Sequence, residues 1–368
     1  MEDARALLAD LVAIDSINPS LVPGGAGEGE IARFVGGWLS ERGLEVDIAD
    51  VEPGRPNVVA RTRGKGGGRS LLLYAHMDVV GVDGMVDPFS PRVEGNRLYG
   101  RGAYDMKAGL AAIMVAAAKA AERGVAGDVI VAAVCDEEFA SIGAQAVAES
   151  VRADAAIVTE PTGAEMTVAI AHKGFTWHEI VVRGRAAHGS RPEDGVDAIA
   201  RMGPVLVELD RFAAELNGRP GHPLLGPGSI HASIIDGGRE LSTYPESCRL
   251  QLERRTLPGE TIEIVEAELT ALLGDVDATL HTTLVREPFE VAADAPIVAA
   301  ARRALGQETP VTGGIGWADS AIFSAAGIPT VIFGPGGEGA HAAVEWVDLD
   351  QLDRCLGALA GVIADFCG

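Results

Sequence analysis

The sequence predicts an α/β protein: a three-layer αβα domain with a mostly parallel sheet, and an α+β domain inserted into it. Short apolar runs at residues 71–75, 129–134 and 155–159 alternate with helical segments, an order typical of parallel sheets. From about residue 175 the expected strands instead alternate apolar and polar residues. Because 368 residues exceed the usual size of one hydrophobic core, two domains are expected.

The N-terminal part of the chain supplies helices and turns to the first domain. Residues 4–14 and 31–42 carry apolar side chains at helical spacing. The alanine-rich residues 110–122 predict a buried helix that ends at Gly124. Residues 63–69 are expected to form a glycine-rich turn rather than a phosphate-binding loop, because the segment lacks the G-K-[ST] ending.

The inserted domain is expected at residues 175–287, and the first domain at residues 1–174 and 288–368. The insert is expected to contain one clear helix and several strands, at residues 197–216 and at residues 176–182, 229–235 and 248–252. The chain then returns to an alanine-rich helix near residues 287–295, a strand at residues 330–333 and a closing helix from residue 349. The first domain is therefore built from both ends of the chain.

The composition argues against some classes of partner. The chain has 53 acidic and 30 basic residues and a formal charge of -23, which disfavours nucleic acid and anionic membranes as partners. It has no run of about 20 apolar residues and no basic-then-apolar start, so a cytoplasmic location is expected. The four cysteines lie far apart, which indicates neither a disulfide framework nor a thiolate zinc site.

Histidines and carboxylates follow the apolar runs of the first domain: His76 with Asp78, Asp105, Glu137 with Glu138, Glu160, and His341. Each has an ordinary structural interpretation on its own, such as a hydrogen-bonded histidine, a helix N-cap or a solvated acidic turn. A parallel sheet, however, brings the loops after its strands to one edge. Such ligands suit zinc or a similar divalent ion, and they are too many for one catalytic zinc. Two metal ions that share one carboxylate fit the set.

Several stretches of the chain match a known family, in that family's order and over nearly the whole length. They are LLLYAHMDVV (71–80), LYGRGAYDMKAG (98–109), CDEEFASIGA (135–144), VTEPTG (158–163), AAHGSRPEDGVDAI (186–199), ERRTLPGE (253–260) and FGPGGEGAHAAVEWV (333–347). The chain thus resembles the di-zinc aminoacylase and carboxypeptidase family of clan MH. That family includes acetylornithine deacetylase and succinyl-diaminopimelate desuccinylase.

The resemblance implies two divalent metal ions, with zinc expected first and cobalt or manganese as substitutes. It implies the following ligands: His76 and Glu160 for one ion, Glu138 and His341 for the other, and Asp105 as the bridge. Glu137 would be the general base, and Asp78 would orient the ring of His76. The resemblance also implies a cis peptide bond between Asp105 and Met106.

The inserted domain would act as a lid and as the interface of a homodimer. The resemblance implies that His188 reaches the neighbouring subunit's site and stabilises the oxyanion, and that Arg255 binds the substrate carboxylate. Arg254 is one strand residue away and should face the other side. Ser242 stands at a substrate-binding position where the family often has asparagine, which leaves the substrate open.

The resemblance implies an amidohydrolase that removes the acyl group from a small N-acyl amino acid, as acetylornithine deacetylase does. Metal-bound hydroxide would attack the amide, with Glu137 as the base. A dipeptidase or carboxypeptidase is the nearest alternative, because a peptide presents the same amide beside a carboxylate. A succinyl-diaminopimelate desuccinylase is a further alternative. The presence of Glu137 and of every ligand disfavours a non-catalytic binding protein, and Glu160 in place of aspartate disfavours an aminopeptidase.

Overall fold

The computed structural model describes residues 4–314 and 316–368, and the chain divides into two compact units. The first unit comprises Met1–Ile170 and Glu290–Gly368, and the second comprises Ala171–Phe289. The first boundary thus lies four residues before the expected position, and the second lies two residues after it. The α/β class with an inserted α+β unit, as the sequence predicts, is confirmed.

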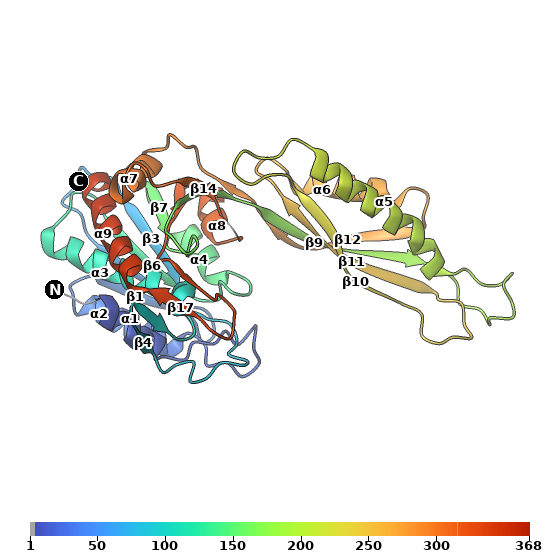
Figure 1. The fold of residues 1–368 in the computed structure, drawn as a ribbon, viewed down its shortest axis with the longest axis horizontal. Helices are drawn as coiled ribbons and strands as arrows, with labels where there is room; N and C mark the ends of the chain where they lie inside the picture. Colours follow the sequence, from blue (N-terminus) through green and yellow to red (C-terminus); the bar gives the residue numbers. More distant parts are fainter. Residues whose placement is uncertain (1–3, 315) are drawn as a thin grey trace. The chain divides into compact units, whose positions relative to one another are not determined.

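The first unit is built on one large sheet (Figure 1). Its strands lie in the order β1 (Glu45–Glu52), β2 (Arg55–Thr62), β6 (Val129–Val134), β3 (Leu71–His76), β7 (Ala155–Val158), β15 (Thr330–Ile332), β8 (Val168–His172) and β13 (Phe289–Glu290), and β14 (Val311–Gly313) pairs with β8. The central strands β6, β3, β7 and β15 run parallel, while β1, β2 and β8 pair in antiparallel fashion.

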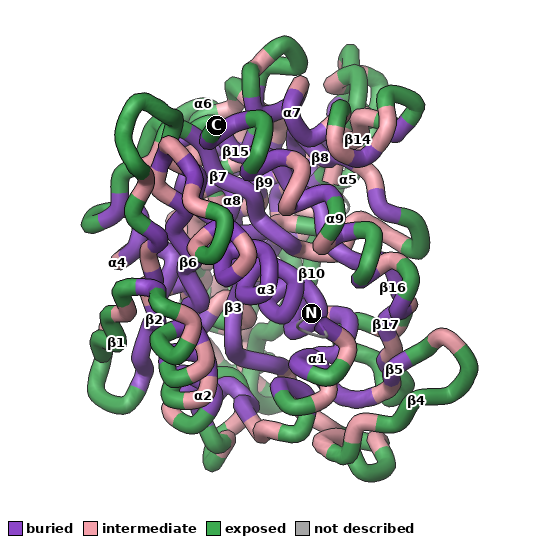
Figure 2. The backbone as a smooth tube through the Cα atoms, turned by 90° about the vertical axis from the view of Figure 1, so that its left-hand side faces the viewer, coloured by how far each residue is buried: buried purple, intermediate pink, exposed green. Residues whose placement is uncertain are grey.

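Burial explains why the sequence marks the central strands so clearly. Every residue of β3, β6 and β7 is buried, whereas β1 at the sheet edge is mostly exposed (Figure 2). A parallel strand covered on both faces needs apolar side chains on both, so it reads as a continuous apolar run. The edge strand β1 carries no such run and was not among the strands predicted from the sequence.

Helices cover both faces of this sheet (Figure 1). One layer contains α1 (Ala4–Val12), α2 (Gly29–Ser40), α3 (Ala108–Arg123), α7 (Pro296–Leu305) and α9 (Leu349–Phe366), and the other contains α4 (Ile142–Ser150) and α8 (Ser320–Ala325). The helix expected near residues 287–295 begins later, because Pro296 occupies the first turn, where proline is favoured. Among the residues that the structure describes, no helix combines the length and apolar composition needed to cross a membrane.

A small antiparallel sheet joins two distant segments of the first unit. It contains β4 (Arg92–Glu94), β5 (Arg97–Tyr99), β16 (Gly337–Glu338) and β17 (Trp346–Asp348). Strand β17 pairs with β5, so the segment before α9 lies beside the segment before Asp105. No sequence pattern predicts these strands, because two or three residues are too few to show a period.

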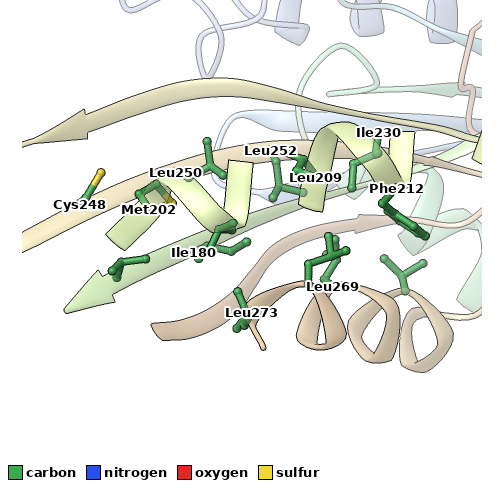
Figure 3. Packing of buried hydrophobic residues seen from close by; sticks show 14 of the residues in the cluster. Ile180, Met202, Leu209, Phe212, Ile230, Cys248, Leu250, Leu252, Leu269 and Leu273 are labelled. Carbon is green, nitrogen blue, oxygen red and sulfur yellow. The ribbon is translucent and has the colours of Figure 1, made fainter. Parts of the chain in front are cut away.

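The second unit is an antiparallel sheet packed against two helices. Its strands lie in the order β10 (Ser229–Gly237), β11 (Ser247–Thr256), β9 (Gly174–Arg183) and β12 (Ala278–Arg286), with α5 (Ala198–Gly218) and α6 (Ile262–Leu273). Met202 and Leu209 of α5 pack with Leu250 of β11 and Leu269 of α6 in one apolar core (Figure 3). Alternation along β9 and β11 supplies the strand side of this core.

Truncation of a core side chain in the second unit should destabilise it strongly. Leu250 is fully buried, so Leu250→Ala is expected to lower the free energy of unfolding by about 2–5 kcal/mol, measured by urea denaturation. The control Val207→Ala removes a side chain that is 66% exposed and should change it by less than about 0.5 kcal/mol. Equal effects of the two variants would contradict this core.

Candidate metal centre

Four of the predicted site residues lie at the carboxyl ends of neighbouring parallel strands. His76 is the last residue of β3, Glu137 and Glu138 follow β6, and Glu160 follows β7. Strand β3 pairs directly with both β6 and β7, with His76 opposite Val134. This register brings the three strand ends together at one edge, where open α/β sheets bind their ligands.

Asp105 and His341 come from irregular segments. Asp105 lies in η1 (Ala103–Lys107), a short turn before α3, and the peptide bond between Asp105 and Met106 is cis, as the resemblance implies. Asp105 does not cap α3, whose N-cap residue is Lys107. His341 lies between β16 and β17 with a positive φ of 61°. The structural role considered for Asp105, an ordinary helix cap, is therefore wrong.

The Asp105 carboxylate lies between the two histidines. Its Oδ1 is 3.4 Å from His76 Nε2, and its Oδ2 is 3.4 Å from His341 Nε2. Glu160 Oε1 lies 3.5 Å from His76 Nε2, and Glu138 Oε2 lies 3.0 Å from His341 Nε2. Two ligand atoms that each lie about 2.1 Å from a tetrahedral zinc ion are about 3.4 Å apart. The spacing therefore suits two ions, one on each side of Asp105.

Two buried atoms of the site have no hydrogen-bond partner in the described structure: His76 Nε2 and Glu160 Oε1. His76 Nδ1 donates to the carbonyl oxygen of Asp78 at 2.9 Å, which leaves Nε2 to face the carboxylates. A buried polar atom without a partner costs about 1–3 kcal/mol. A metal ion bound by both atoms would remove this cost, so the residues present fit a metal.

The electrostatics of the site also fit cations. Burial, followed by the negative charge of nearby carboxylates, raises the pKa of Glu137 and of Glu160 well above the usual value, and raises that of Glu138. Burial opposes ionisation of Asp105 too, but its contacts with His341 and His76 outweigh this and lower its pKa. Crowded buried carboxylates repel one another, and bound divalent cations would relieve that repulsion.

The two adjacent glutamates lie on different sides of the site. Possible ligand atoms of His76, Glu137 and Glu160 lie within 4.8 Å of one another, as do those of His76, Asp105 and Glu138. Glu137 Oε2 is 4.0 Å from His76 Nε2, whereas Glu138 contacts His341. Two neighbouring carboxylates can therefore take different roles, with one on a metal ion and one on a proton.

Asp78 supports the site in a way that the sequence did not indicate. Its carboxylate accepts hydrogen bonds from the backbone N–H groups of Glu137, at 3.1 Å, and of Glu138, at 3.2 Å. The His76 ring donates its hydrogen bond to the Asp78 carbonyl, while the nearest Asp78 carboxylate oxygen is 3.7 Å from Nδ1. Asp78 thus holds the turn that carries both glutamates.

A buried polar network continues behind this turn. Asn18 donates to Asp78 at 2.8 Å and to Asp136 at 3.0 Å. Arg55 binds Asp136 at 2.9 Å and donates to both carboxylate oxygens of Glu28, at 2.6 and 2.7 Å. Asn18, Glu28 and Arg55 could not be predicted from the sequence, because they are distant along the chain and no local pattern marks them.

Three predicted site residues belong to the second unit. His188 pairs with Thr243 in an antiparallel bridge, and the N–H of Gly189 donates to the Ser242 carbonyl at 2.7 Å, so the segments of His188 and Ser242 are neighbours. On β11, Arg255 Nε donates to Glu253 at 2.7 Å. The opposite face of this strand carries Arg254, which is buried and paired with Glu260 at 2.7 Å.

The family model described as peptidase family M20/M25/M40 matches residues 72–365. Acetylornithine deacetylase of Myxococcus xanthus is 31% identical, over 99% of this chain and 97% of that protein. Aminopeptidase PepT of Bacillus cereus has a similar fold, with a TM-score of 0.82 at 20% identity over 99% of this chain and 98% of that one. The YXEP protein of Bacillus subtilis, described as a dinuclear metal binding peptidase, gives a TM-score of 0.75 at 19% identity, over 99% and 98%.

These matches confirm the resemblance that the motif stretches indicate. The family model covers most of the chain, and the Myxococcus relative is similar over nearly its full length. Together with the histidines and carboxylates at the sheet edge, they support a metal-dependent amide hydrolase. The chain belongs to peptidase family M20/M25/M40.

Proposed function

We propose that the protein removes the acyl group from an N-acyl amino acid with the help of two divalent metal ions, for which zinc is the first candidate. The observation that carries the proposal is the Asp105 carboxylate, whose two oxygens each face one histidine. The name of the Myxococcus relative, acetylornithine deacetylase, favours an N-acetyl amino acid as the substrate. N-Acetylornithine is accordingly the first candidate.

Ligand roles follow from the two sides of the site. His76 and Glu160 would hold one ion, Glu138 and His341 the other, and Asp105 both. The ions, when bound, supply a water molecule of lowered pKa and a Lewis acid for the amide carbonyl. The protein must then move a proton from that water to the leaving nitrogen.

Glu137 is the proposed proton carrier. Its carboxylate accepts a proton as water adds its oxygen to the carbonyl carbon, and it returns a proton to the amine as the C–N bond breaks. The products are a carboxylate and a free amino group. Asp78 holds the backbone of Glu137 and Glu138 in place, so the base and its neighbouring ligand keep separate positions.

The second unit would supply groups for the oxyanion and the substrate. The Nδ1 atom of His188 accepts a hydrogen bond from the N–H of Ser190 at 3.2 Å, which leaves Nε2 to act as the donor of the ring. Such a donor suits a developing oxyanion. We expect Arg255 to bind the substrate carboxylate with Ser242 nearby, and we expect a homodimer in which His188 serves the neighbouring subunit's site.

A dipeptidase or carboxypeptidase with the same centre is the second candidate function. The metal-binding residues around Asp105 would serve hydrolysis of the amide bond itself. They do not distinguish an amide whose carbonyl belongs to an acyl group from one whose carbonyl belongs to an amino-acid residue. Arg255, a single carboxylate-binding group, serves either substrate. Substrate preference, rather than the metal centre, therefore distinguishes the two candidates.

A substrate panel tests the proposal. Metal-free protein should be inactive, and added zinc, cobalt or manganese should restore hydrolysis, because the metal ions activate the water. The panel contains N-acetyl and N-succinyl amino acids and dipeptides, with release of the free amine as the measurement. N-Acetylornithine should give the highest kcat/KM. A preference for dipeptides would favour the second candidate, and hydrolysis without metal would contradict both.

Replacement of the proposed base should separate chemistry from metal binding. Glu137→Gln is expected to lower kcat by about 100- to 10,000-fold while both metal ions stay bound, because it removes only the proton carrier. The matched variant Glu138→Gln should lose metal, because Glu138 lies beside His341. Metal content by atomic absorption and kcat are measured together. Loss of metal in Glu137→Gln alone would show that the two roles are reversed.

Removal of the proposed oxyanion donor should affect turnover alone. His188→Ala is expected to lower kcat by about 100- to 1,000-fold, with metal content unchanged, because one preorganised donor is lost. The control His281→Ala removes another exposed histidine of the second unit and should leave kcat unchanged. Full activity of His188→Ala would remove this residue from the mechanism.

A further inference from the structure

The carboxylate of Glu345 is buried, and both of its oxygens accept hydrogen bonds from the segment that carries Asp105. One of its oxygens accepts from the N–H of Gly102 at 3.0 Å and from Arg101 Nη1 at 2.6 Å. The other oxygen accepts from the N–H groups of Tyr104, at 2.9 Å, and of Asp105, at 3.0 Å. The Glu345 side chain is 0% exposed, and that of Arg101 is 2% exposed.

These hydrogen bonds set the shape of an irregular segment. Gly102 has a left-handed φ of 77°, and the backbone angles of Asp105 and Met106 are not helical. A regular helix would satisfy few of the N–H groups at its start, and the side chain of the N-cap residue of α3 makes no capping bond. Glu345 takes the place of such a cap, three residues upstream of α3, and positions the backbone of Asp105.

Arg101 extends the contact to two other segments of the site. Its Nη2 donates to the carbonyl of Gly81 at 2.9 Å and to that of Ala342 at 3.1 Å. Ala342 directly follows His341, and Gly81 follows Asp78 by three residues. The pair of Arg101 and Glu345 therefore joins the Asp105 segment to the segment of His341 within the first unit.

We propose that Glu345 is a positioning residue which, together with Arg101, holds Asp105 between His76 and His341 and so sets the affinity of the site for both metal ions. The inference rests on the proposed metal-dependent function. Asp105 faces both histidines, so a displaced Asp105 weakens both ion sites. Loss of a residue that holds a metal ligand in place typically lowers metal affinity by about 10- to 100-fold.

The decisive variant is Glu345→Gln. Glutamine has nearly the same volume, but its amide nitrogen is a donor and would face N–H groups that need an acceptor. We expect both metal ions to bind about 10- to 100-fold more weakly, measured by competition with a chromophoric chelator. The visible spectrum of the cobalt-loaded protein should also change, because the ligand geometry at Asp105 changes.

Arg101→Lys provides a second variant should Glu345→Gln fail to fold. Lysine keeps the charge beside Glu345 but cannot reach Gly81 and Ala342 together with it. The Ala342 contact is next to His341. This variant should therefore lower the affinity for the ion held by His341 more than the affinity for the ion held by His76. If folded Arg101→Lys binds both metal ions as tightly as the unmodified protein does, the result counts against the proposal.

The matched control is Asp348→Ala, three residues further along the same segment. Asp348 caps α9 by accepting hydrogen bonds from the N–H groups of Asp350 and Gln351, and it contacts none of the candidate metal ligands. It should lower the urea midpoint and leave both metal affinities unchanged. If Asp348→Ala loses metal as readily as Glu345→Gln does, the effect of Glu345→Gln is explained by general destabilisation and the proposal is overturned.

Two outcomes separate this inference from the proposed function. Metal affinities in folded Glu345→Gln within twofold of the unmodified protein would overturn the role of Glu345 and leave the function intact. Failure of the unmodified protein to bind any divalent ion would instead overturn the proposed function. Weakened metal binding with an altered cobalt spectrum, in Glu345→Gln but not in Asp348→Ala, is the supporting result.

Discussion

The short side chain of Asp105 imposes the strictest constraint on the candidate metal centre. One carboxylate faces two histidines at 3.4 Å each, and an aspartate has too few rotatable bonds to compensate for a misplaced backbone. The backbone must therefore be correct to within about half an ångström. A buried carboxylate, Glu345, meets this demand because its bonds go to the backbone itself, including the N–H of Asp105.

The sheet positions the other half of the centre by register. Strand β3 lies between β6 and β7, so His76 lies between the turn of Glu137 and Glu138 and the loop of Glu160. Such crowding of buried carboxylates is unfavourable without cations. Several further buried polar groups hold these carboxylates in place. Asp78 is the nearest of these groups, because it binds the backbone of both glutamates.

The predictable parts are those that leave a local pattern. Buried parallel strands such as β3 and β6 appear as apolar runs, so His76 at the end of β3 and Glu138 after β6 could be singled out. Arg55, Glu28 and Arg101 could not, because their partners lie far along the chain, and a buried charge looks like an exposed one in the sequence. The roles of His188, Arg255 and Ser242 stay predictions, since they depend on a bound substrate.

The first unit is interrupted by the second, and this has a consequence for biosynthesis. Strand β15, α9 and the segment with His341 and Glu345 all follow the insert, more than 150 residues after β7. A ribosome must therefore synthesise the whole insert before the sheet gains β15 or Asp105 gains its second histidine. Until then the nascent chain holds exposed apolar strand edges and a cluster of carboxylates that lacks one of its two histidines, a state in which long-range contacts form slowly and chaperones are most useful.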